Sequence, residues 1–237
     1  NYHEEVNAII DNADKLKKYS IFNKAGSFSY ANILQTARDF ERVKNVILPE
    51  DEYKGVQAYT TYYYQYFFTM LVMMFVIYDM FAQRDNGMWS ITYSCANGRI
   101  MYAIKQTGVI VVTGAFTHTL IYWSTFIAAM LQRGGVRDLV NPVQTIETFD
   151  KFTYPWSKIK YVTVLYLISM VCIVALCITI WGVFVMFRNR VYALVTMLIF
   201  AAVEQFIYSH IDIHSVWNGL HYINIINIIN INATFSS

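Results

Sequence analysis

The stretch YVTVLYLISMVCIVALCITIWGVFVMF, residues 161–187, decides the fold class of this chain. It contains no Asp, Glu, Lys or Arg from its first residue to its last. A helix needs about 20 mainly apolar residues to cross about 30 Å of hydrocarbon. A helix in the core of a soluble protein rarely stays uncharged for so long, so this stretch predicts a transmembrane helix.

Three further apolar runs predict helices of the same kind. Residues 56–81 are uncharged except near their end, and residues 106–132 hold no charged side chain. Residues 191–211 hold one, Glu204. The whole chain is 56% hydrophobic and only 14% charged, whereas soluble domains usually carry about 25% charged residues. We therefore expect an all-α integral membrane protein with four transmembrane helices.

Residues 1–55 differ from the rest because charged residues are frequent there. Apolar residues recur at helical spacing in two sets, which are Val6, Ile9, Ile10, Ala13 and Leu16, and Tyr30, Ile33, Leu34, Ala37 and Phe40. The two sets predict two amphipathic helices that pack on each other, separated near Gly26. A helix lying on the membrane surface is the alternative, although such helices are usually more one-sidedly basic.

The basic residues between the predicted spans indicate the orientation of the chain. Short loops rich in Lys and Arg tend to remain in the cytoplasm. The turn 188–190 is of this kind, with two arginines in three residues, and the connection 82–105 holds Arg84, Arg99 and Lys105. The loop 133–160 carries five basic residues, so the count leans only slightly towards the first two as cytoplasmic. We therefore expect residues 82–105 and 188–190 to be cytoplasmic, and residues 1–55, 133–160 and 212–237 to be extracytoplasmic.

Two ionisable residues, His118 and Glu204, lie inside predicted spans, where such groups are costly and often functional. In one interpretation they line a substrate path. In the other they are buried polar groups that join helices, each contributing about 1 kcal/mol. His210 and His214 stand four residues apart, but two His without a thiolate are too few for a typical zinc site. We predict no metal and no cofactor.

The connection 82–105 is long for a link between two spans and has glycine at two points, Gly87 and Gly98. We expect it to hold a short helix at the cytoplasmic surface, ended by Asn97-Gly98. The segment resembles the loop after the second membrane helix of ABC-2-type permeases in three places, which are Gly87-Met88, Gly98-Arg99 and Lys105. Members of that family often have Glu-Lys before the first glycine, where this chain has Arg84-Asp85-Asn86.

Three other stretches resemble a bacterial branch of the same family. They are residues 18–22 with 27–29, residues 144–149 before the third span, and residues 220–224 after the fourth. The family's first and last helices have no counterpart, and the chain does not begin with Met. We therefore expect a fragment that lacks both ends.

The resemblance implies a multi-pass permease subunit of the plasma membrane. Such permeases work as homo- or heterodimers on two cytoplasmic ATPase subunits, and the loop after the second helix passes the motion of the ATPases to the membrane. The residues that match this coupling loop are Gly87, Met88, Trp89, Gly98, Arg99 and Lys105. The resemblance favours an exporter and leaves its substrate open.

The chain itself has no phosphate-binding G-x-x-x-x-G-K-[ST] loop, so we expect it not to be an enzyme and the ATPase to be a separate subunit. Its net charge of +2 gives no sign of nucleic-acid binding. The alternative function is a membrane-anchored sensor or scaffold that binds a peptide through residues 1–55 and the loop 133–160.

Overall fold

The computed structural model describes residues 2–19, 27–49, 54–61, 65–85, 87, 94, 98–133, 135–146, 149, 152–210, 217–220 and 224. Over these residues the regular elements are all helices, and an isolated bridge joins Pro142 to Ser157. The chain is therefore all-helical in the part that the structure describes, as the apolar runs predict.

Three helices are long and apolar enough to cross a membrane. They are α7 (Gly98–Arg133), α8 (Lys158–Met186) and α9 (Arg190–His210). Large apolar side chains remain exposed along them and along the shorter α4, among them Phe75, Val112, Phe116, Leu120, Val171, Ile199 and Phe206. A belt of this size is unfavourable in water and is expected where side chains face lipid. The exposed belt therefore indicates a membrane protein.

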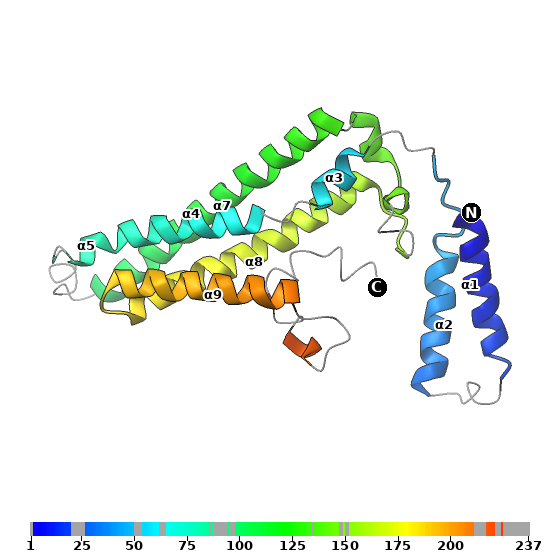
Figure 1. The fold of residues 1–237 in the computed structure, drawn as a ribbon, viewed down its shortest axis with the longest axis horizontal. Helices are drawn as coiled ribbons and strands as arrows, with labels where there is room; N and C mark the ends of the chain where they lie inside the picture. The colour runs from blue at the N-terminus through cyan, green and yellow to red at the C-terminus, as the bar shows by residue number, and fades with distance from the viewer. Residues whose placement is uncertain are drawn as a thin grey trace.

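The first predicted span is divided, and this differs from the single helix expected at 56–81. The described residues form α3 (Gly55–Thr61) and α4 (Gln65–Met80), and Figure 1 shows α3 tilted from the axis of α4. Within the described residues α4 alone is shorter than a typical span.

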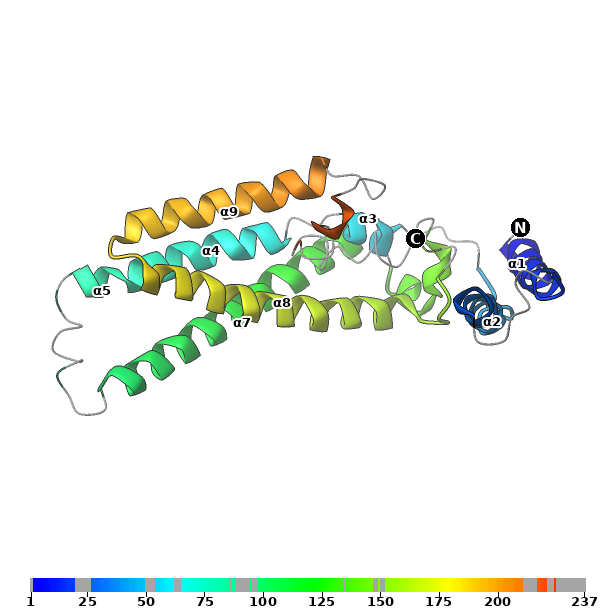
Figure 2. The ribbon, with the colours of Figure 1, turned by 90° about the horizontal axis from the view of Figure 1, so that it is seen from below.

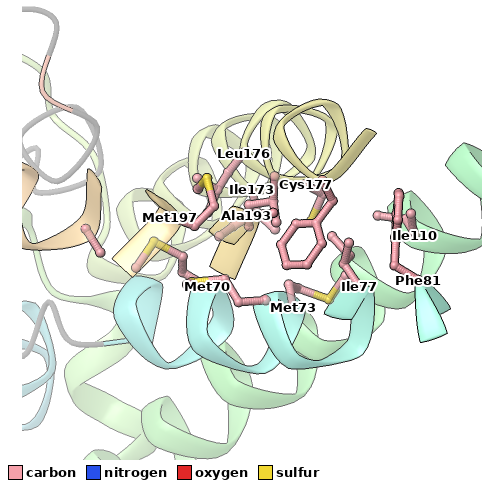
Figure 3. Packing of buried hydrophobic residues seen from close by; sticks show 14 of the residues in the cluster. Met70, Met73, Ile77, Phe81, Ile110, Ile173, Leu176, Cys177, Ala193 and Met197 are labelled. Carbon is pink, nitrogen blue, oxygen red and sulfur yellow. The ribbon is translucent and has the colours of Figure 1, made fainter. Parts of the chain in front are cut away.

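The helices pack as an elongated bundle, with α4 against α7, α8 and α9 (Figures 1 and 2). The centre is unusually rich in methionine: Met70, Met73 and Met74 of α4 meet Ile173 and Cys177 of α8 (Figure 3). Methionine is unbranched and adapts to irregular gaps, so this interface can accommodate small shifts of α4 against α8.

Helix α7 lies close to α8 at Gly114. A Cβ atom built on Gly114 would lie only 2.5 Å from Sγ of Cys177, and 3.7 Å from its Cβ. We expect Gly114→Ala to lower the free energy of unfolding by about 1–3 kcal/mol, because overpacking must push the helices apart. Unfolding by a titration with a denaturing detergent, followed by helical circular dichroism, measures this change.

Two further variants test that contact. Cys177→Ala removes the clashing sulfur, so the double variant Gly114→Ala/Cys177→Ala should be more stable than the sum of the single effects predicts. Gly108→Ala, on the same helix with open space around the added methyl, is the control. Equal losses at Gly108 and Gly114 would contradict the close approach as the cause.

Two helices form in the N-terminal region, α1 (Tyr2–Leu16) and α2 (Phe28–Glu41), and they pack on each other as a hairpin. The hydroxyl of Ser27 caps α2 by accepting from the backbone N–H of Tyr30 at 3.2 Å. Val6, Ala13 and Ala37 are buried between the helices. The hairpin stands apart from the bundle (Figure 1), with Arg42 reaching over the ring of Tyr154 at 5.6 Å.

A compact cap closes the end of the bundle that lies nearest the α1–α2 hairpin (Figure 1). We use this name for residues 135–146, Phe149 and residues 152–157, which include the short helices η1 (Val136–Val140) and η2 (Val143–Thr145). Its buried rings pack on α7 and α8, with Phe149 at 5.0 Å from Tyr161. The buried amide of Gln144 donates to the carbonyls of Phe152 and Tyr154, at 2.9 and 2.8 Å. The cap is thus a packed unit.

The connections fall at two ends. The short helix α5 (Ala82–Asp85), the beginning of α7 and the turn between α8 and α9 lie at one end, and the cap and the α1–α2 hairpin lie at the other (Figure 1). The two connections that the sequence predicts to be cytoplasmic, 82–105 and 188–190, thus lie at the same end of the bundle.

Candidate functional site where α5 meets the α8–α9 turn

Helix α5 (Ala82–Asp85) follows α4 after a turn at Phe81, and Gly87 lies in a turn just beyond it. The N–H of Gly87 bonds the carbonyl of Arg84 at 3.0 Å, and its φ is +76°. Side chains rarely adopt this left-handed conformation, whereas glycine reaches it without steric cost. The backbone conformation therefore accounts for a glycine at position 87, which is the first of the two glycines in this connection.

The guanidinium of Arg84 joins the two connections at this end of the bundle. Its Nη1 donates to the carbonyls of Phe184 and Phe187, at 3.1 and 2.8 Å. Its Nη2 donates to the carbonyl of Arg188 at 2.9 Å. The last carbonyls of a helix have no partner within the helix and carry the negative end of its dipole. Arg84 therefore caps α8 from another helix, and we call this contact the Arg84 clamp.

Aromatic rings hold the clamp in position. The Arg84 guanidinium lies over the ring of Phe81 at 4.9 Å, and Phe81 packs against Phe184 at 5.5 Å between ring centres. Beside them, Arg190 lies over the ring of Tyr78 at 4.5 Å. Since Phe81 and Phe184 are fully buried, the planar group of Arg84 is directed at the end of α8 by a rigid support.

Sequence reasoning missed this contact: it counted Arg84 as a basic residue that indicates orientation and treated Arg84-Asp85-Asn86 as a departure from the family pattern. The partners of Arg84 are backbone carbonyls about a hundred positions later in the chain, and carbonyls have no sequence signature. The available signal was an arginine directly after an apolar run, at the level where the ends of neighbouring helices meet.

The other predicted coupling residues are distributed differently from the expectation. Residues 98–105, assigned to the loop from the sequence, form the first two turns of α7, so Gly98 begins a helix. Arg99 lies in the first of these turns, and Lys105 is exposed on the second. Met88 and Trp89 lie outside the described residues. Among the residues described, Gly87 is the predicted coupling residue adjacent to the clamp.

His118 lies at the centre of the bundle and is 1% exposed. Its Nε2 is 2.8 Å from the hydroxyl of Ser169 on α8, and its Nδ1 is 3.5 Å from the hydroxyl of Thr69 on α4. The ring stacks parallel to Tyr166 with centres 6.2 Å apart. His118 thus connects three helices, a geometry that favours the helix-joining interpretation.

Glu204 occupies a different place, on the inner face of α9, and is 8% exposed. It lies within electrostatic range of the Tyr66 hydroxyl on α4. Its backbone carbonyl accepts a hydrogen bond at 2.8 Å from the buried side chain of Asn224. His118 and Glu204 thus project from different helices, α7 and α9, and each lies near a side chain of α4, Thr69 and Tyr66 respectively.

We expect His118→Leu to lower the free energy of unfolding by about 1 kcal/mol, the usual size of a polar contact between membrane helices. The loss stays small because Ser169 and Thr69 also bond carbonyls of their own helices, at 2.9 and 2.8 Å. Detergent-induced unfolding measures the effect, with the exposed His210 changed to Leu as the control. A loss no larger than that of the control would contradict the helix-joining role.

No metal site is found: among the described residues, no group of three or more His, Cys, Asp or Glu could hold a metal ion. His210 instead stacks on Phe206 at 4.5 Å, and His214 lies outside the described part of the chain. Comparison of the chain with protein-family models, curated proteins and solved structures finds no match in any of the three.

Proposed function

We propose that this chain is the transmembrane permease subunit of an ATP-driven ABC transporter of the ABC-2 type, which works as an exporter. The observation that supports the proposal most directly is the Arg84 clamp. A permease has to convert the movement of a cytoplasmic ATPase into movement of membrane helices, and in this chain three hydrogen bonds tie the connection after α4 to the end of α8.

The clamp would make the α8–α9 turn follow any displacement of α5. An ATPase that pulled on the segment between α5 and α7 would also move α8 and α9. The reason is that Arg84 and the buried rings around it are closely packed and allow little independent movement of α5 and α8. The adaptable methionine interface of α4 with α8 could absorb the accompanying shifts.

Further parts of the proposal follow from this arrangement. The α5 end of the bundle is cytoplasmic, and the cap and the α1–α2 hairpin are extracytoplasmic in the plasma membrane. Helices α3 and α4 together form the first of four spans. Two permease subunits, identical or different, associate with two ATPase subunits. Glu204 faces the substrate path, and the substrate stays open.

A purification experiment tests the proposal. The full-length protein is isolated from its native membrane, and an ATPase with a phosphate-binding loop is expected to come with it in stoichiometric amount. Replacing residues 86–97 by a Gly/Ser linker of equal length, with Arg84 and α7 intact, should abolish that association.

The same replacement in residues 20–26, between α1 and α2, is the matched control and should leave the association unchanged. If no ATPase accompanies the intact protein, the permease proposal fails. The separate α1–α2 hairpin would then favour the alternative function, a membrane-anchored sensor or scaffold with its ligand at the extracytoplasmic end.

A further inference from the structure

A cavity of about 320 Å³ opens where α3, α4 and α7 meet, at the end of the bundle that carries the cap. This volume falls in the range of small-molecule sites, which begins at about 300 Å³. Its walls are mainly apolar and include Ala58 of α3, Phe68 of α4 and Ala128 of α7. The cavity lies outside the region of the Arg84 clamp, and the proposed function does not use it.

One wall of the cavity is rigidly packed. Tyr59 lines it, and its ring is packed edge-on against Tyr122 and Phe126 at 5.4 and 5.2 Å. The Tyr59 hydroxyl bonds the side-chain oxygen of Gln65 at 3.3 Å. Because the small side chain of Ala128 leaves the space open and Tyr59 is only 3% exposed, the hollow is formed before any ligand arrives.

The two ends of the cavity differ in polarity. Along α7 the lining runs from Thr125 to Arg133, a rise of about 12 Å at about 1.5 Å per residue. Arg133 ends the helix, at the level where α3 begins, and its carbonyl accepts from the N–H of Lys54 at 3.1 Å. Phe68, the lining residue from α4, is apolar and 58% exposed.

One edge of the cavity carries a positive charge. Arg133 lines the cavity and is exposed, and among the described residues it has no carboxylate within ion-pair distance. A mainly apolar cavity with a cation at one edge matches a molecule with an aliphatic chain and an anionic head.

We propose that this cavity binds an anionic amphiphile. Its aliphatic chain lies against Ala128 and Phe68, and its head group lies at Arg133. The site is independent of the proposed transport function, because it needs only the arrangement of α3, α4 and α7. A lipid of the membrane and a lipid-linked molecule in transit share this chemistry.

Native mass spectrometry of the full chain in neutral detergent tests the proposal. The probes are myristoyl lysophosphatidylglycerol, which is anionic, and myristoyl lysophosphatidylcholine, which has the same chain and a zwitterionic head. We expect the anionic probe to bind about tenfold more tightly, because its head group carries no choline cation to offset the attraction of its phosphate to Arg133. Equal binding of the two probes to the unmodified protein would overturn the proposal.

Three variants locate the site. Ala128→Phe fills the cavity from an exposed position, so the fold should persist while both probes bind at least about tenfold more weakly. Arg133→Gln should remove the preference for the anionic probe and keep the binding of the zwitterionic one. Ala202→Phe, an equally exposed alanine on α9, is the control and should bind like the unmodified protein.

Ala128→Leu is a second, smaller filling variant in case the larger ring perturbs folding, which circular dichroism monitors. Unchanged affinity in both variants at Ala128 would overturn the proposed location. The source of the natural ligand is read from the species that accompanies the protein from its own membrane. A phospholipid mass identifies a resident lipid, and a lipid-linked peptide or glycan identifies a molecule in transit.

Discussion

Replacing Lys158 by methionine is expected to lower the free energy of unfolding by about 3–5 kcal/mol, the largest stability effect that we predict for this chain. The Nζ of Lys158 donates to Oδ1 of Asp138, and the two residues are 1% and 0% exposed. Removing the ammonium leaves a carboxylate inside the protein without its counter-charge. The cost of that isolated charge exceeds the contribution of the hydrogen bond itself.

The position of the pair explains why the damage should spread beyond one contact. Lys158 is the first residue of α8, and its N–H bonds the carbonyl of Asn141 at 2.9 Å. Next to this bond, the N–H of Val143 bonds the carbonyl of Trp156 at 2.9 Å. The ion pair and these two bonds hold the cap on the end of the bundle, so the variant should lose the cap before the helices separate.

Two further variants are measured beside Lys158→Met. Lys160→Met is the matched control, because Lys160 is exposed and its ammonium lies over the ring of Trp156 at 4.9 Å, an interaction worth about 0.5–1 kcal/mol. Lys158→Met/Asp138→Leu removes both charges and should recover much of the loss. Thermal unfolding in detergent, followed by circular dichroism, measures all three. A Lys158→Met loss as small as that of the control would contradict a buried pair.

The sequence predicted the membrane helices well where length alone decides the structure. Apolar runs that are long enough to cross a membrane correspond to α8 and α9 almost from end to end, because few other structures tolerate them. α7 begins eight residues before its apolar run, at Gly98. The absence of charge sets no boundary for a helix that continues into a polar region, so this earlier start carried no signal.

Tertiary contacts were beyond the reach of the same reasoning. From the sequence, Lys158 counted only among the basic residues of the loop 133–160, because its pairing with Asp138 depends on how the cap folds. His118 was recognised as unusual, yet its partners Ser169 and Thr69 are common residues of apolar runs. In each case the sequence pattern identified one side chain, but its hydrogen-bond or ion-pair partner became known only from the fold.

Arg84→Gln is expected to release the end of α8 and to uncouple the two connections at the α5 end. The arginine makes three hydrogen bonds to carbonyls at the end of α8 and in the following turn, and glutamine lacks both the charge and the planar fork that reaches them. Charge-assisted hydrogen bonds are worth about 1.5–3 kcal/mol, so local opening of the last turn should rise at least about tenfold. Hydrogen exchange at residues 184–190 measures this without reference to any function.

Arg188→Gln is the matched control, because it changes an exposed arginine in the same turn while keeping the carbonyl that Arg84 binds. Exchange as slow in Arg84→Gln as in this control would remove the clamp as the link between α5 and α8. Faster exchange would establish the link and leave its purpose to a second measurement. In the complex with the proposed ATPase, ATP hydrolysis should continue in Arg84→Gln while substrate movement falls. Loss of hydrolysis and transport together would instead indicate that the variant no longer holds the ATPase, so the two readouts separate coupling from assembly.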